Sequence, residues 1–352
     1  MSVHEVYRAS LRSFFIALIF SLFFLFFVGI LSMSIGPSSY SFRDVITIIL
    51  RNLGLNPAGA NSGDTASLVI LNIRLPRTLI SVLVGASLGL SGVLIQAVTR
   101  NPLAEPFLLG LPSGALAFVS FFMAFSPYPL YSRWLIAMIA FIGALFAFLL
   151  TLGLSESIGG GASSLILAGI AVSAGFSGIA HVLSFIVESR MKIPFAILLM
   201  GSFSTSLKSD ILIMLPIFIL GFVLSFSLSK GLNAIIFGDE HSLQLGYDPK
   251  MTRRVAIIIT SLLTGTAVAI SGIIGFIGLV IPHISRLLVK SDHRMVVPMS
   301  AVLGGAIMCL SDVAIRIISL IPVSAGELPV GAVTSAIGAP FFAYLLLRRM
   351  RG

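Results

Sequence analysis

Ten stretches of predominantly apolar residues divide this chain, and no other sequence feature limits its possible folds as strongly. A helix needs about 20 apolar residues, with a range of roughly 17 to 25, to cross the hydrocarbon core of a bilayer. Stretches near that length predict about ten transmembrane helices, and the run at 275–289 is the shortest. The predicted spans lie near residues 13–35, 69–98, 106–124, 134–154, 163–187, 210–228, 251–271, 275–289, 296–318 and 331–349.

The scarcity of charged residues leads to the same fold class. Of 352 residues, 22 are basic and 13 are acidic, which is 10% of the chain, whereas a soluble domain carries roughly a quarter. We therefore expect an all-α, polytopic membrane protein with a single transmembrane domain over residues 1–352. The first run is too long for a signal-peptide core and lacks a good cleavage site, so it is predicted to be a retained helix. The longest polar stretch, 36–68, is predicted to be a loop.

The net charge of +9 would suggest a nucleic-acid partner in a soluble protein. Here the basic residues lie between apolar runs, which indicates contact with anionic lipid and a positive-inside bias instead. With the N-terminus in the cytoplasm, thirteen Lys and Arg lie in cytoplasmic segments and nine outside. An even number of spans then places both termini in the cytoplasm. Three of the outside residues, Arg74, Arg77 and Arg316, sit at helix ends.

Small residues are frequent inside the spans. Gly85 and Gly89 have the spacing that lets two helices approach closely in lipid, and Gly175 and Gly178 lie in another span. They predict a compact helix bundle. The single cysteine, Cys309, lies in an apolar run and is predicted to be a packing residue.

The chemistry that the sequence lacks narrows the function. No Gly-Lys dipeptide occurs, which excludes a phosphate-binding loop of the G-x-x-x-x-G-K-[ST] type. Carriers driven by proton or sodium gradients usually have acidic residues near mid-membrane, whereas here only Asp312 lies deep in a span, one turn from Arg316 with which it can pair. The sequence therefore favours a transporter that takes its energy from a partner, and a secondary carrier remains the alternative from a different class.

An enzyme is a weaker alternative. The segment Gly175-Phe176-Ser177-Gly178 resembles the serine motif of rhomboid-type intramembrane proteases, with His181 and His283 as candidate bases. Ser177 and His181 would have to act from one helix, and ten spans exceed the six or seven of such proteases. Channel lining or packing is the favoured interpretation of Ser177, and no catalytic or metal-binding residue is expected.

A polar insert at 237–249 separates the sixth and seventh predicted spans. Asp239 is predicted to be the N-cap of a short helix, Leu243 and Leu245 to form its apolar side, and Gly246 to end it. A helix of about two turns is unstable alone, so it should rest on another surface. The insert is either an ordinary interfacial loop or a knob that docks on a cytoplasmic partner.

Several separated motifs together resemble one family, the FecCD permeases of ATP-binding-cassette importers for iron-siderophores, haem and vitamin B12. The resemblance covers nearly the whole chain. The motifs are Arg74-Leu75-Pro76-Arg77-Thr78-Leu79, Asn101-Pro102-Leu103-Ala104-Glu105-Pro106, the insert from Gly238 to Gly246, Gly275-Phe276-Ile277-Gly278-Leu279-Val280-Ile281-Pro282-His283 with Arg286, Asp292-His293-Arg294, Glu327-Leu328-Pro329-Val330-Gly331 and Gly338-Ala339-Pro340.

The resemblance implies a type II importer permease with ten spans per subunit. It implies a homodimer, or a close heterodimer, around a central pathway in the cytoplasmic membrane. Two ATPase subunits would lie below it and hold ATP and Mg, so this chain would need no cofactor of its own. An extracytoplasmic binding protein would deliver the ligand from above.

The resemblance also assigns roles to individual residues. The positions that would couple to the ATPase are Asp239, Glu240, Leu243, Leu245 and Gly246. The arginines that would meet glutamates of the binding protein are Arg74, Arg77 and Arg316. A cytoplasmic gate would lie at Asn101, Leu103, Ser163 and Ser164, and Ser173, Ser177 and His181 would lie near the pathway or behind it. Among the family's ligands an iron-siderophore is preferred, with cobalamin second and haem third.

Overall fold

A computed structural model describes residues 3–55, 64–126, 132–159, 162–191, 199–320 and 328–351. Within these ranges all regular secondary structure is helical. The helices of the first half are α1 (Val3–Ser34), α2 (Phe42–Asn52), α3 (Asp64–Val69), the π-helix η1 (Ile70–Arg74), α4 (Leu75–Val98), the 3-10 helix η2 (Pro106–Leu109), α5 (Leu111–Phe125), α6 (Arg133–Ser157) and α7 (Ala162–Met191). The second half contains α9 (Lys208–Ile236), α10 (Asp239–Gln244), α11 (Pro249–Ser271), α12 (Ile277–Val289), α13 (His293–Ser319) and α14 (Val330–Arg351).

The all-α class and the ten predicted apolar runs are confirmed. Seven helices of the described residues are long and apolar enough to cross a membrane, and three shorter apolar helices cover the runs at 111–125, 277–289 and 330–344. The run at 275–289 forms the 13-residue helix α12, about 20 Å long. Because the hydrocarbon core is about 30 Å thick, α12 crosses only part of it.

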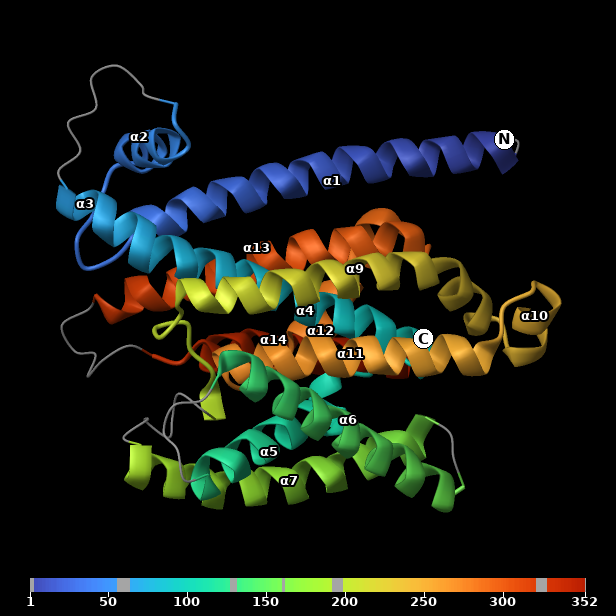
Figure 1. Ribbon diagram of the computed structural model, residues 1–352. Coiled ribbons are helices and arrows are strands. Elements are labelled where there is room, and N and C mark those ends of the chain that lie inside the picture. Colours follow the sequence, from blue (N-terminus) through green and yellow to red (C-terminus); the bar gives the residue numbers. More distant parts are fainter. Residues whose placement is uncertain are drawn as a thin grey trace.

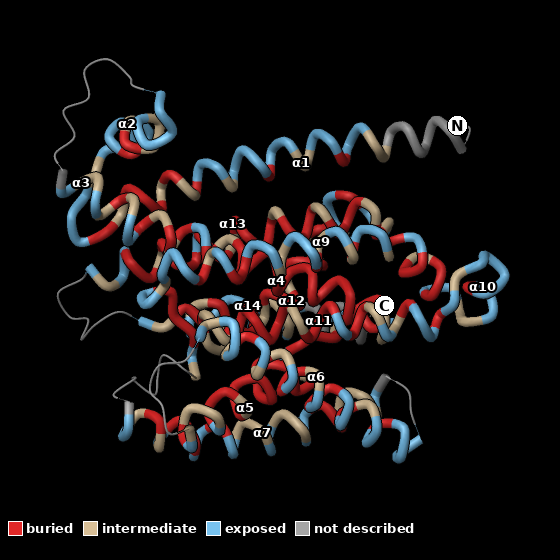
Figure 2. The backbone as a smooth tube through the Cα atoms, viewed as in Figure 1, coloured by how far each residue is buried: buried red, intermediate tan, exposed pale blue. Residues whose placement is uncertain are grey.

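Helix α4 occupies the centre of the bundle. It packs against α13, α9, α11 and α12. Of its most apolar 18-residue stretch, 89% is buried. Helices α5, α6 and α7 form a second group beside α11, whereas α1 lies along one side (Figure 1). Only 17% of the most apolar 18-residue stretch of α1 is buried, and Figure 2 shows exposed and intermediate residues along most of it. Exposed phenylalanines such as Phe20 and Phe23 suit contact with lipid.

Glycine pairs bring the central helices into backbone contact, as the small-residue spacing predicts. A Cβ atom added to Gly85 would lie 2.2 Å from the carbonyl oxygen of Gly304, and one added to Gly92 would lie 1.9 Å from that of Gly278. These positions join α4 to α13 and α12. By contrast, Gly175 and Gly178 on α7 have nothing within 4 Å, so the packing role predicted for them is not seen within this chain.

The prediction of a loop over 36–68 is wrong for part of that stretch. Helix α2 begins after Ser41, whose side chain accepts a hydrogen bond from the Asp44 N–H, while Asp44 accepts one from the Ser41 N–H. This reciprocal capping box stabilises the first turn. Val45 and Ile48 are buried, whereas Phe42 and Ile46 are exposed. Helix α2 was not predicted because its 11 residues are fewer than the roughly 17 to 25 apolar residues of a membrane-spanning helix.

The bundle has two distinct ends. Helices α2 and α3 lie where α1 finishes, and α10 lies at the opposite end (Figure 1). The first residues of α1 and the last residues of α14 both lie in the half that carries α10. This arrangement positions the two sets of candidate functional residues at opposite faces of the membrane domain.

Candidate functional site

Arg74, Arg77 and Arg316 come together at the end of the bundle where α1 finishes, and we call them the three-arginine cluster. Asp312 of α13 lies among them and is fully buried. Its carboxylate accepts hydrogen bonds from Arg77 Nε at 2.9 and 3.1 Å and from Arg77 Nη2 at 2.6 Å. Arg316 Nη2 lies 3.0 Å from the other oxygen. One carboxylate therefore pairs with two of the three guanidinium groups and neutralises one of their three charges.

Arg74 and Arg316 also hold the last turn of α1. Arg74 Nη1 donates to the carbonyl oxygens of Met33 and Ser34 at 2.7 and 2.9 Å, and its guanidinium lies 4.7 Å from the ring centre of Tyr40. Arg316 Nη1 donates to the Ser32 carbonyl at 2.6 Å. The last carbonyls of a helix lack partners within the helix and carry partial negative charge, which makes cations suitable caps.

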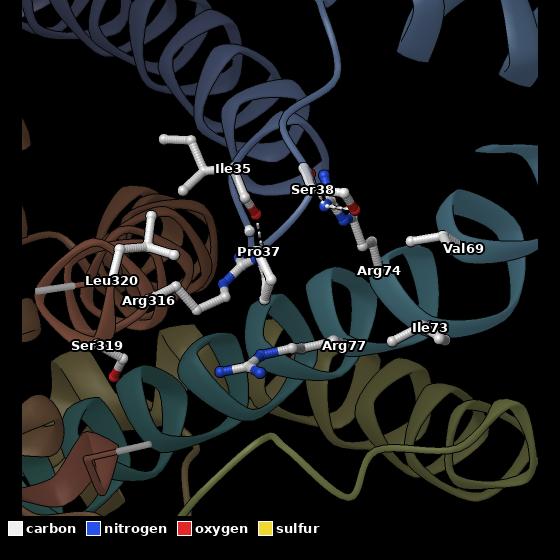
Figure 3. Close-up of a pocket in the computed structure, with 11 residues that line it drawn as sticks. Ile35, Pro37, Ser38, Val69, Ile73, Arg74, Arg77, Arg316, Ser319 and Leu320 are labelled. Atoms are coloured by element: carbon white, nitrogen blue, oxygen red, sulfur yellow. Dashed lines mark hydrogen bonds between the residues drawn. The ribbon is translucent and has the colours of Figure 1, made fainter. Parts of the chain in front are cut away.

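The cluster lines an open depression with a volume of about 550 Å³ between residues 35–38 after α1, the segment from α3 through η1 into α4, and the end of α13. Figure 3 shows Arg74 turned toward Ser38 and Arg316 turned toward Ile35. The sequence predicted that Arg316 could pair with Asp312, and this pair is present. It did not predict the pair between Arg77 and Asp312, which are 235 residues apart in the chain. No pattern in one sequence signals such a contact.

The polar insert folds into α10 at the opposite end. Gly238, with φ +119°, is the N-cap residue, and Asp239 is the first residue of the helix. The prediction that Asp239 is the N-cap is therefore wrong, because the glycine before it supplies a backbone geometry that other residues rarely adopt. Gly246 has φ +81° and donates to the Leu243 carbonyl at 2.9 Å. It ends the helix as predicted.

Asp239 instead binds two arginines from neighbouring segments. Arg253 of α11 donates to both carboxylate oxygens, at 2.8 and 2.5 Å, and Arg100, just after α4, also pairs with it. The hydrogen bonds from Arg253, together with the charge of Arg100, hold the pKa of Asp239 below its usual value. The carboxylate is therefore ionised at neutral pH and anchors α10 to the bundle.

The outer side of α10 is apolar and exposed. Leu243 is 59% exposed and Leu245 is 54% exposed, and Phe237 beside them is 75% exposed. Glu240 is exposed as well. Figure 2 shows α10 projecting from the bundle as an exposed segment. Exposed apolar side chains on a projecting segment are typical of a surface that contacts a protein partner or the membrane.

The four gate positions lie in two turns. Asn101 is buried, and its Oδ1 accepts a hydrogen bond from the Leu103 N–H at 3.0 Å. Leu103 itself is half-buried. Ser163 is exposed and Ser164 is half-buried in the first turn of α7. Of the four, Asn101 has a buried side chain that stabilises its own turn through this hydrogen bond.

A smaller cavity of about 220 Å³ lies between α5, α7 and the residues that follow α11. Ser173, Ser177 and His181 all line it, so the three candidate pathway residues share one cavity. The ring of His283 on α12 packs edge-on against Phe341 of α14, with 5.6 Å between ring centres. Among the described residues, no group of three or more His, Cys, Asp or Glu side chains could hold a metal ion. Glu327 of the sequence motif at 327–331 lies outside the described residues.

Comparison with known proteins identifies the family. A sequence model of the FecCD transport family matches residues 22–348, nearly the whole chain. The chain belongs to the FecCD transport family. FecCD membership makes it a multi-pass membrane permease of the ATP-binding-cassette importer type, and it favours the transport interpretation of Ser177 and His181 over the protease interpretation.

Relatives within the FecCD family carry different names at similar identity. The chain is 39% identical, over 81% of its length and 84% of the relative, to a probable iron chelatin transport system permease protein of Helicobacter pylori. It is 35% identical, over 94% and 95%, to the hemin transport system permease protein HmuU of Yersinia pestis. It is 36% identical, over 81% and 75%, to the cobalamin import system permease protein BtuC of Halobacterium salinarum.

A solved structure confirms the permease fold. A metal-chelate type ABC transporter, described in an inward-facing conformation, superposes with a TM-score of 0.76 at 30% sequence identity. The match covers 94% of this chain and 98% of that one. The ten apolar helices, including the short α12, therefore follow the arrangement of a type II importer permease.

Proposed function

We propose that this chain is the permease subunit of an importer that moves an iron-siderophore-type chelate across the cytoplasmic membrane. It works as a homodimer with two ATP-binding-cassette ATPases on the cytoplasmic side and a binding protein on the other. Both termini and α10 lie in the cytoplasm, and residues 1–352 act as a single transmembrane domain. The observation that carries the proposal is α10, whose apolar side projects from the bundle without covering any part of it.

The ATPase docks on α10 and the chain holds no nucleotide itself. Leu243 and Leu245 supply the apolar contact, Glu240 adds an exposed charge, and Gly246 fixes the end of the helix. Asp239 faces the bundle and ties α10 to it through Arg100 and Arg253. The exposed apolar side of α10 can bind the ATPase, and its ion pairs to the bundle can transmit movement of the ATPase to the transmembrane helices. ATP and Mg are held by that partner.

The binding protein docks over the three-arginine cluster. Three guanidinium groups and one carboxylate leave a local charge of +2, which favours an acidic partner surface. Guanidinium groups form paired hydrogen bonds with carboxylates and stay charged. Because Asp312 and the carbonyls of α1 already occupy these groups, a partner glutamate has to share Arg77 or Arg316 with Asp312.

The ligand is assigned at the level of chemical class. Relatives named for an iron chelatin, hemin and cobalamin have 39%, 35% and 36% identity, and these values are too close to separate the three. The cavity that contains Ser173, Ser177 and His181 is weakly polar. An iron-siderophore is the broadest of the three classes and is preferred. Cobalamin is the second candidate and haem the third.

Uptake into proteoliposomes tests the proposal. The chain, its co-purifying ATPase and the binding protein of the same system are reconstituted, and entry of ⁵⁵Fe-labelled ferrichrome, hemin and cyanocobalamin is measured with and without internal ATP. We expect ATP-dependent entry of the iron chelate. Equal entry without ATP would support a secondary carrier, and entry of hemin or cyanocobalamin alone would reassign the ligand.

A further inference from the structure

The carboxylate of Asp239 joins three segments that are far apart in the sequence. Its partners are Arg253 at the start of α11 and Arg100 in the turn that follows α4. Arg100 also donates from Nε to the carbonyl oxygen of Ile235, in the last turn of α9, at 2.6 Å. The side chain of Arg100 therefore bridges the end of α9 and the first residue of α10.

The backbone of Arg100 is strained. Arg100 has φ +50° and occupies the position just after the C-cap of α4, where its N–H donates to the Ala97 carbonyl at 3.2 Å. Glycine is the usual residue at this position, since a left-handed conformation brings the Cβ of other residues too close to the backbone. Strained residues of this kind concentrate at functional sites.

The ion pair between Arg100 and Asp239 stabilises the fold too little to offset the backbone strain at Arg100. The Arg100 and Asp239 side chains are 37% and 46% exposed, and ion pairs this exposed contribute little to folding stability. A glycine at position 100 would fit the backbone at least as well. The arginine is therefore better explained by the connection that its side chain makes than by the free energy of folding.

That connection ends beside the gate positions. Arg100 directly precedes Asn101, whose side chain fixes the turn by binding the Leu103 N–H. Any displacement of Asp239 acts on Arg100 at once and on Asn101 through one peptide unit. Arg253, the other partner of Asp239, belongs to α11 and is not adjacent in the chain to a proposed gate residue.

We propose that Arg100 and Asp239 are positioning residues that transmit movement of α10 to the gate turn at 100–103. This inference rests on the proposed function, in which an ATPase moves α10. Arg100 acts as a strut between the knob and the turn, and Arg253 only secures the knob to α11. Neither residue touches the transported ligand.

The accessibility of the gate turn to a soluble reagent tests the strut. Leu103→Cys is introduced together with Cys309→Ser, which removes the buried native thiol, and complexes that retain the ATPase react with a charged maleimide. Labelling is compared without nucleotide and with ATP plus vanadate. Arg100→Gly removes the strut while suiting the backbone, Arg100→Lys preserves the charge, and Arg253→Gln removes the other arginine from Asp239.

We expect a several-fold change in labelling rate between the two states in the parent protein and in Arg253→Gln. In Arg100→Gly the ratio falls to about one, although the ATPase remains bound and hydrolyses ATP, and Arg100→Lys restores part of the response. A full response in Arg100→Gly, or no response in the parent, would overturn the inference. Failure of the parent chain to retain an ATPase would instead overturn the proposed function.

Discussion

At the scale of single residues, Asp312 is the common partner of two of the three arginines in the cluster. It is fully buried, binds Arg77 through two nitrogens, and pairs with Arg316 one turn along α13. Both arginines are also proposed to meet the binding protein. Asp312 and a partner carboxylate therefore compete for the same donors, and this competition separates a docking role from a purely structural one.

Replacing Asp312 by Asn tests that competition. The amide keeps the shape and accepts one hydrogen bond, so we expect a loss of about 3 kcal/mol in stability, the low end of the cost of breaking a buried ion pair. Docking of the binding protein should nevertheless become several-fold tighter at low salt, because two guanidinium groups are released. Thermal unfolding in detergent and surface plasmon resonance measure the two effects.

Asp210→Asn is the matched control for this change. Asp210 is also fully buried and pairs with Arg133 at 3.0 Å, but it lies outside the three-arginine cluster. It should lose stability without altering docking. Unchanged or weaker docking in Asp312→Asn would mean that the cluster serves only to anchor α1.

At the scale of elements, backbone contact between glycines defines the central packing. The approach of α4 to α13 at Gly85 leaves no room for a side chain, since an added Cβ atom would lie 2.2 Å from the Gly304 carbonyl oxygen. Helix α7 has equally small residues whose Cβ positions are open, as at Gly178. The same residue type therefore has opposite consequences in two helices.

Alanine substitutions at these two positions should separate the roles. Gly85→Ala is expected to lower stability by about 1–3 kcal/mol, the usual cost of overpacking. Gly178→Ala should be neutral or slightly stabilising, because alanine favours a helix by up to about 1 kcal/mol over glycine. Thermal unfolding of the purified chain measures both. A loss at Gly178 as large as that at Gly85 would show that the open face of α7 is covered by another chain.

The sequence predicted elements well where their signal is local. Ten apolar runs follow from the positions of apolar residues along the chain, and the end of α10 follows from Gly246. Helix α2 was missed because it is short and half polar, although Ser41 and Asp44 form a capping signal that could have revealed it. The contacts of Asp239 with Arg100 and of Arg77 with Asp312 were missed because these partners, 139 and 235 residues apart, are brought close only by the packing of distant helices.

At the scale of the whole molecule, the two proposed docking surfaces lie at opposite ends of the bundle. The three-arginine cluster lies where α1 finishes, and α10 lies at the opposite end with the first residues of α1 (Figure 1). The gate turn at 100–103 is linked to α10 by Arg100. In the proposed mechanism, movement of α10 therefore reaches the proposed gate without passing through the three-arginine cluster.

A cross-link between two copies tests the gate at this scale. The side chain of Asn101 is buried in its own turn, whereas Leu103 is half-buried, so Leu103→Cys with Cys309→Ser is the informative protein. We expect the two copies to form a disulfide across the dimer axis in one nucleotide state and to lose it in another. Equal yields with and without ATP would move the gate to Ser163 and Ser164.

Retention of the ATPase by the purified chain tests whether α10 is its docking element. The parent chain is compared with a variant in which residues 239–246 are replaced by a Gly/Ser linker of equal length. Both should insert and fold, because α10 contributes little to the packed core. The account predicts that the parent retains a stoichiometric ATPase and that the linker variant retains none. Equal retention by both proteins would contradict the assignment of α10 as the docking element.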